Sequence, residues 1–184
     1  MKKENKNKFK EYWAWPLKVL IMALCLSFGF SFLSELTLSK ASIIISIVVI
    51  LIFIALSILF DMVGLAVASC SIEPFTSMAS RKIVGSKQAI ILINNADRVS
   101  SIMNDVIGDV CGILSGAAGA SILTKIALEN AGNIKVVLIS SLVSAIIAGL
   151  TICGKALFKK IAINYCVPIT LALAKFVNFF TRKG

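Results

Sequence analysis

Four long apolar runs, separated by short polar segments, constrain this chain more than any other feature of its sequence. They cover approximately residues 17–36, 41–68, 99–126 and 136–153. A helix needs about 20 apolar residues to cross a bilayer. The second run is longer than that, so we expect it to tilt or to protrude. The pattern predicts an all-α integral membrane protein with four transmembrane helices.

The composition and the placement of charge agree with this class. Hydrophobic residues make up 58% of the chain and the mean hydropathy is +0.94, whereas a soluble domain is closer to half apolar. The net charge is +10, and the basic residues flank the apolar runs, as in MKKENKNKFK and GKALFKK. Lys and Arg in such places orient spans and pair with anionic lipid headgroups. No basic helix or aromatic platform accompanies the charge, so we expect no nucleic-acid binding.

The distribution of basic residues also predicts the orientation of the chain. The tail at residues 1–12, the segment 69–98 and the segment 154–184 are basic, so the positive-inside rule places them in the cytoplasm. The loops near residues 35–40 and 129–135 are nearly neutral and belong outside. We therefore predict a multi-pass protein of the cell membrane with both termini cytoplasmic. The frequent Lys, Ile and Asn indicate a bacterial source.

The segment 69–98 is too polar to cross the membrane. Its sequence predicts a helical hairpin at the cytoplasmic surface, with a short helix from Pro74, a break at Gly85 and an amphipathic helix to Ile93. Asp97 is then placed to cap the next helix.

The end of the chain predicts helices that lie on the membrane. After Gly154 the lysines fall on one face and the apolar residues on the other, as in an interfacial amphipathic helix. A further apolar stretch follows Pro168. It is short and Lys175 interrupts it, so we expect it to lie along the membrane.

Two carboxylates interrupt the third run, in SIMNDVIGDVCGILSGAAGAS. Asp105 and Asp109 are one helical turn apart and share a stripe with Gly112 and Gly116. Small residues at this spacing let another helix approach closely, so we expect the stripe to be buried in protein. Ionised carboxylates inside a membrane cost several kcal/mol unless a cation or a water-filled cavity offsets the cost.

A bound divalent cation would remove both this cost and the repulsion between Asp105 and Asp109. Hard ions such as Mg²⁺ take oxygen ligands and often keep several waters. Asn104 adds a neutral oxygen nearby. Asp61, which interrupts the second apolar run, is a further candidate ligand.

A purely structural role for the two acids is the alternative. The third helix would then enter the membrane only near Val106, which leaves Asp105 at the interface. Asp109 would pair with Lys155 or Arg98 for structural reasons alone.

The residue types argue against an enzyme. There is no histidine, and the five cysteines lie singly in apolar segments, at positions 25, 70, 111, 153 and 166. An intramembrane enzyme would need a nucleophile with a base, or a metal held by His and carboxylates. We expect the cysteines to act as small core hydrophobes.

From about residue 42 to residue 175, the order of these features resembles the transmembrane domain of the cyclin M / CorB–CorC magnesium transporters. The stretch ASCSIEPFTSMASRKIVGSKQA is similar to the hairpin of that family, and Asp97-Arg98 to its DR pair. The G-N-x-x-x-N motif of the family falls on Asn104 to Asp109, and its G-E-I-x-P-K motif on GKALFK at 154–159. The resemblance makes residues 41–184 the family's domain, without regulatory cytoplasmic domains. Residues 1–40 are then an added basic tail and first transmembrane helix.

The resemblance implies export of Mg²⁺ or a similar divalent cation from a homodimer, driven by Na⁺. In the family, the two asparagines, serines near the end of the first span and the acid of G-E-I-x-P-K surround the ion. These positions correspond here to Asp105, Asp109 and Ser69 or Ser71. In this chain, Lys155 occupies the position of the acid of G-E-I-x-P-K. The lysine either belongs to a rearranged cation site or occupies the place of the ion in a non-transporting membrane scaffold or accessory subunit.

Overall fold

The computed structural model describes residues 15–32, 42–127 and 134–181. Within these ranges every regular element is a helix and no strand occurs. Three helices of the described chain are long and apolar enough to cross a membrane: Trp15–Phe32, Ile43–Ser69 and Ser141–Asn164. The prediction of an all-helical chain with long apolar helices is confirmed. The basic tail at residues 1–12 lies outside the described residues.

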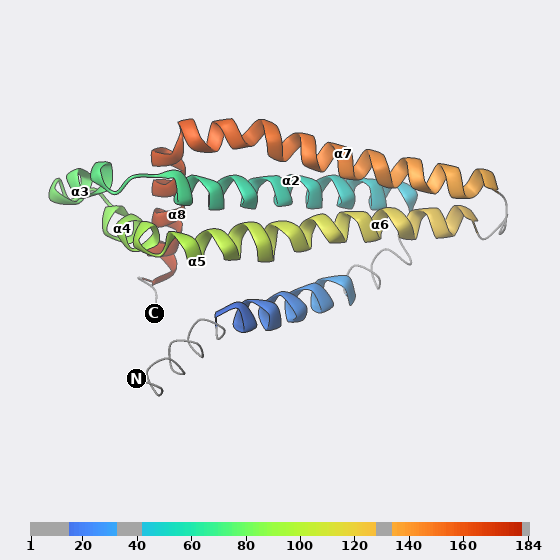
Figure 1. Cartoon of the computed structure of the whole chain (residues 1–184), viewed down its shortest axis with the longest axis horizontal. Helices are drawn as coiled ribbons and strands as arrows, with labels where there is room; N and C mark the ends of the chain where they lie inside the picture. The colour runs from blue at the N-terminus through green and yellow to red at the C-terminus, as the bar shows by residue number, and fades with distance from the viewer. Residues whose placement is uncertain (1–14, 33–41, 128–133, 182–184) are drawn as a thin grey trace, which may run out of the picture.

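Three helices form a bundle in which they lie side by side (Figure 1). They are α2 (Ile43–Ser69), α6 (Asp109–Ala127) and α7 (Ile134–Asn164), and α2 packs against both of the others. The buried core between them contains Ile50 and Ile54 of α2 with Ala118 and Ile147. Large apolar side chains also cover the outside of the bundle, including Ile44, Leu51, Leu138 and Leu150. Such an outer surface suits lipid rather than water.

The predicted hairpin is confirmed. It consists of α3 (Glu73–Ser80) and α4 (Ser86–Asn94) at one end of the bundle (Figure 1). Pro74 lies in the first turn of α3, where its missing N–H costs no hydrogen bond. The break falls at Gly85, whose φ of 91° is left-handed and favours glycine. A Cβ at Gly85 would also meet Cγ of Lys175 at 2.9 Å, so the C-terminal helix that carries Lys175 packs closely there.

The third apolar run forms one long helical rod of three parts. These are α5 (Ala96–Ser100), the π-helical η1 (Ser101–Gly108) and α6. The predicted cap, Asp97, lies inside the first turn of α5, so that prediction was wrong. The N–H of Asn95 bonds to carbonyls of α4, so α5 begins directly after α4 and leaves no separate cap. We predicted that this run is one of four spans, but the rod is not among the three described helices that are long and apolar enough to cross a membrane. Its side chains are described only as far as Gly119.

We expected the fourth span to end near Cys153 and an interfacial helix to follow it, but α7 continues unbroken from Ile134 to Asn164. Gly154 instead lies against α2, where a Cβ would collide with the side chain of Ile58. Its small size serves close packing of α7 on α2 rather than termination of a helix.

The last helix, α8 (Cys166–Thr181), runs across the end of the bundle (Figure 1). It packs on α4, and Nε2 of Gln88 donates to Oδ1 of Asn178 at 2.8 Å. Its apolar part, Cys166–Phe179, is shorter than the three long helices.

The helix Trp15–Phe32 lies beside the bundle (Figure 1). The guanidinium of Arg98 sits 5.0 Å from the centre of the Trp15 ring, a cation–π distance. An apolar cavity of about 310 Å³ separates this helix from α2 and α6, lined on the helix side by Leu26 and Phe30.

Candidate cation site

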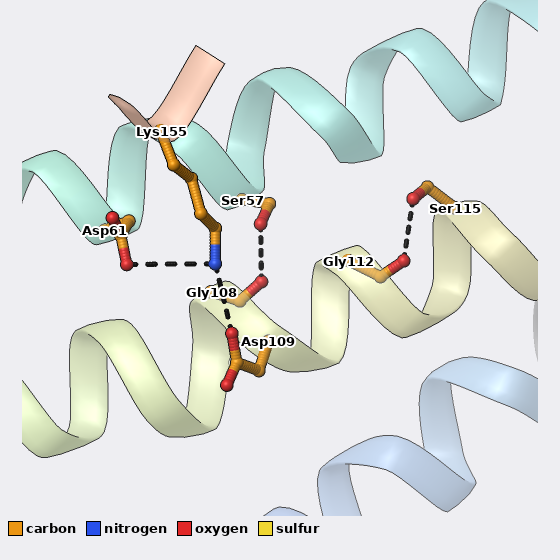
Figure 2. A network of polar contacts seen from close by, with 7 residues as sticks. All are labelled: Ser57, Asp61, Gly108, Asp109, Gly112, Ser115 and Lys155. Carbon is orange, nitrogen blue, oxygen red and sulfur yellow. Dashed lines mark hydrogen bonds and ion pairs between the residues drawn. The ribbon is translucent and has the colours of Figure 1, made fainter. Parts of the chain in front are cut away.

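Three charged side chains from three helices meet inside the bundle (Figure 2). Nζ of Lys155 on α7 lies 3.0 Å from Oδ1 of Asp109 on α6 and 3.8 Å from Oδ1 of Asp61 on α2. The Lys155 and Asp61 side chains are 25% and 26% exposed, and that of Asp109 is 61% exposed. One positive charge thus bridges carboxylates of two neighbouring helices.

A short hydrogen bond fixes α2 against the rod beside this cluster. The hydroxyl of Ser57, one turn before Asp61, donates to the carbonyl of Gly108 at 2.6 Å, and the bond is buried (Figure 2). A Cβ at Gly108 would lie 3.6 Å from the carbonyl oxygen of Ser57, and one at Gly112 would lie 3.6 Å from Oγ of Ser57. The expectation that the glycine stripe lets another helix approach is confirmed at Gly112, and the helix is α2. It was wrong at Gly116, which is exposed and where no atom of the described chain lies within 4 Å of an added Cβ.

A second close approach places an amide oxygen on the same face of α2. A Cβ at Gly64 would collide with Oδ1 of Asn104. That oxygen is buried and has no hydrogen-bond partner among the described residues. Gly64 follows Asp61 by three residues, so both lie on one face of α2. A neutral oxygen of the predicted ligand set therefore faces α2 about one turn from the ion pair.

Asp105 does not join this cluster. It is exposed on η1 and makes no ion pair within the described part of the chain. We expected Asp105 and Asp109 to act together because an α-helix aligns positions four apart. A π-helix has more residues per turn, so η1 changes that register immediately before Asp109. Arg98, an alternative partner for Asp109, lies over Trp15 instead.

The two serines that the family resemblance suggested lie elsewhere. Ser69 is the last residue of α2 and is exposed. It follows Asp61 by eight residues, or about 12 Å along the helix axis. Ser71 is exposed beyond the end of α2. The structure therefore keeps Asp61, Asp109 and Lys155 together and leaves Asp105, Ser69 and Ser71 outside.

A groove of about 400 Å³ opens between α6 and α7 beside the ion pair. Lys155 and Asp109 line it, together with the hydroxyl-bearing residues Ser115, Ser144 and Thr151. The hydroxyls of Ser115 and Thr151 donate to carbonyls of their own helices at 2.7 and 2.8 Å. The half-buried Thr151 oxygen keeps a lone pair that can accept from water or contact a cation, whereas Ser115 is buried.

Sequence reasoning missed these hydroxyl residues. Ser144, Thr151 and Lys155 lie at positions i, i+7 and i+11 of α7, which share one helix face. This spacing is the signal that could have found them.

The oxygen atoms of the cluster are ligands of the kind that a hard cation takes. Within the described chain, no group of three or more His, Cys, Asp or Glu side chains gathers. Two carboxylates with waters would still be a reasonable Mg²⁺ environment, because Mg²⁺ often keeps part of its hydration shell. The same two carboxylates are paired with Lys155, so an arriving cation would have to displace the ammonium.

Comparisons with protein-family models, with curated proteins and with solved structures find no match to this chain.

Proposed function

We propose that this protein transports Mg²⁺ or a similar divalent cation across the membrane, through a site in which Lys155 holds the place of the ion. The observation that carries the proposal is the position of the Lys155 ammonium between Asp61 and Asp109. Asp61 lies on α2, which is long and apolar enough to span a bilayer, and acids inside membrane spans mark ion pathways. The resemblance to the cyclin M / CorB–CorC transporters supports the choice of ion.

The charge balance of the site explains how the Lys155 ammonium and a divalent ion would alternate between the two carboxylates. The carboxylates of Asp61 and Asp109 with one ammonium carry a net charge of −1, so the occupied site still attracts cations. A divalent ion between the carboxylates brings their combined charge to zero. The long side chain of Lys155 can then withdraw toward the headgroups, as lysines near helix ends do. The exposed Lys159 and Lys160 follow on α7, which agrees with a nearby membrane surface.

The groove between α6 and α7 supplies a path to this site. It reaches Asp109 and Lys155 and carries hydroxyls along its length, whereas most of the outer surface of α7 is apolar. In this proposal Asp61 and Asp109 are the charged ligands and Asn104 is a neutral one. Asp105 lies outside the ion's contacts.

Purified protein in liposomes that enclose a Mg²⁺ indicator tests the proposal. Asp61→Asn and Asp109→Asn should each abolish Mg²⁺ influx, and Asp105→Asn is the matched control that should retain it. If Asp105→Asn stopped the flux while Asp61→Asn did not, the site would be the Asp105–Asp109 pair that the sequence alone suggested. Measuring the flux with and without an imposed Na⁺ gradient tests whether transport is coupled to Na⁺. We propose this coupling, and a homodimer, from the resemblance.

The same ion pair favours a second function, that of a non-transporting scaffold or accessory subunit. A permanent lysine would neutralise the site and hold α7 on α2 and α6. The parent protein would then show neither Mg²⁺ flux nor Mg²⁺ binding by calorimetry, while Lys155→Gln would gain binding. Both functions place the protein in a membrane. The cell membrane, with both termini cytoplasmic, remains our proposal from the distribution of charge.

A further inference from the structure

Two cysteine thiols that are far apart in the sequence lie side by side at the end of the bundle. Cys70 directly follows α2, and Cys166 is the first residue of α8. Their sulfur atoms are 2.6 Å apart, although the two residues are 96 positions apart in the sequence. The other described cysteines, at positions 25, 111 and 153, show no such sulfur neighbour in the described part of the chain.

Packing from three elements holds the two thiols in this place. Cys70 belongs to a buried cluster with Phe75 of α3, Ala89 of α4 and Ala174 of α8, and Cys166 packs against that cluster. Phe75, Ala89 and Ala174 are each fully buried. The two sulfurs therefore face each other because the hairpin and α8 are docked on the end of α2.

The two thiols differ in their exposure to solvent. Cys70 is only 8% exposed, whereas Cys166 is half-buried. A small reagent from solution reaches Cys166 first, and Cys70 lies directly behind it.

We propose that Cys70 and Cys166 are a redox modification site, which a low-molecular-weight disulfide converts to an intramolecular disulfide and a small thiol reverses. The Cys166 thiolate attacks the reagent RSSR, forms a mixed disulfide and releases RS⁻. Cys70 then gives up its proton to solvent, attacks the Cys166 sulfur and releases the second RS⁻. The protein loses two protons and two electrons, and the reagent takes both up and leaves as two RSH. In a reducing compartment, reversible disulfides of this kind are those that sense redox state.

The bond would connect the end of α2 to α8, close in sequence to two of the three residues of the ion pairs. Asp61 lies nine residues before Cys70 on α2, and Lys155 lies eleven residues before Cys166, on α7. A disulfide would tie the end of α2 to the start of α8, which follows α7 after the single residue Tyr165. It would restrict any separation of α7 from α2. This regulatory consequence rests on the proposed transport, whereas the dithiol site itself does not.

The full-length protein, purified with reductant, is incubated with oxidised glutathione and quenched with N-ethylmaleimide in denaturant, so that every free thiol reacts, and its intact mass and proteolytic peptides are measured. The expected product lacks two hydrogens, carries three maleimide groups instead of five, and contains a Cys70–Cys166 linked peptide. Reduced glutathione should reverse it. A stable glutathione adduct on Cys166, a link to another cysteine or five alkylated thiols at every glutathione ratio would overturn the proposal.

Cysteine variants distinguish the roles of the two thiols in the reaction. Cys70→Ser should retain glutathione on Cys166, and Cys166→Ser should lose the reaction of Cys70. Cys153→Ser, an exposed cysteine on α7, is the matched control and should still close the bond. Mg²⁺ flux is then compared between the oxidised and reduced parent proteins. Absence of flux in both states would count against the proposed function, while the mass measurement decides the dithiol independently.

Discussion

The ammonium of Lys155 lies 3.0 Å from a carboxylate oxygen of Asp109, although 46 positions separate the two residues. Asp109 begins α6 and Lys155 lies in the second half of α7. The two helices run side by side, so the start of one meets the end of the other (Figure 1). Asp61, at 3.8 Å, extends this contact to α2. A single lysine therefore connects all three helices of the bundle.

Replacing this lysine should make the stability of the protein depend on Mg²⁺. Lys155→Gln leaves Asp61 and Asp109 without their cation, and we expect a loss of about 1 kcal/mol, because all three groups are partly exposed. Mg²⁺ should restore the melting temperature of the variant more than that of the parent. Thermal unfolding in detergent with and without Mg²⁺ measures both effects.

The control for that experiment is Lys159→Gln, which makes the same charge change one turn later on an exposed part of α7. It should alter neither the melting temperature nor its response to Mg²⁺. Equal behaviour of the two variants would mean that the Lys155 ion pairs carry no specific energy.

Ser57 should contribute to stability through its bond to the Gly108 carbonyl. Ser57→Ala removes the donor of a buried 2.6 Å hydrogen bond and leaves the carbonyl without that partner. We expect a loss of about 1–2 kcal/mol in the free energy of unfolding. Ser80→Ala is the comparison, because the Ser80 hydroxyl bonds within its own helix at an exposed position. A loss of the same size in both variants would show that the contact between helices adds nothing.

Local signals explain which parts of the fold could be predicted. The hairpin followed from Pro74 and Gly85, whose conformational limits act within a few residues. The continuity of α7 did not, because the role of Gly154 depends on Ile58, which is remote in the sequence. A glycine that ends a helix and a glycine that lets a helix pack look alike until the partner is known.

The candidate site could be predicted only in part for the same reason. Asp109 and Asp61 could be recognised because they are acids within apolar runs. Lys155 could be recognised because it is a base where the resembling family has an acid. Their meeting depends on how α2, α6 and α7 pack, which one sequence does not specify. The π-helical η1 changes the helical register between Asp105 and Asp109. No residue pattern in SIMNDVIG predicted that change of register.

The thiol of Cys70 should be slow to alkylate in the folded protein. Burial, then the contact with Cys166, raises its pKa from 9.0 to about 12, so little thiolate exists near pH 8. Maleimide labelling at pH 8, followed by peptide analysis, should modify Cys166 before Cys70, and both thiols equally in denaturant. Equal labelling rates in the folded protein would contradict the burial of Cys70.

The same raised pKa predicts a dependence of stability on pH. The folded state holds the Cys70 proton more tightly than the unfolded state, whose thiol ionises near its usual 9.0. This contribution to stability is therefore complete below pH 9 and declines as the pH rises toward 12. Cys70→Ser should reduce the decline in melting temperature over that range, and Cys153→Ser should not.

Gly154 offers the sharpest test of how α7 packs on α2. Gly154→Ala places a methyl group against Ile58, and we expect a loss of about 1–3 kcal/mol from overpacking. Gly149→Ala is the matched control on the same helix, because nothing lies within 4 Å of a Cβ at Gly149. There the better helix propensity of alanine should leave stability unchanged or raise it by up to about 1 kcal/mol.

A compensating change in Ile58 distinguishes steric crowding from a simple loss of helix structure. Ile58→Ala removes the side chain that the new methyl group would meet, so the Gly154→Ala penalty should be smaller in the double variant than in the parent. Gly154 also precedes Lys155, so crowding there should move the ammonium away from Asp61 and change Mg²⁺ binding by calorimetry. Equal penalties in both backgrounds, with Mg²⁺ binding unchanged, would mean that the Gly154–Ile58 contact neither limits the packing of α7 nor positions the lysine.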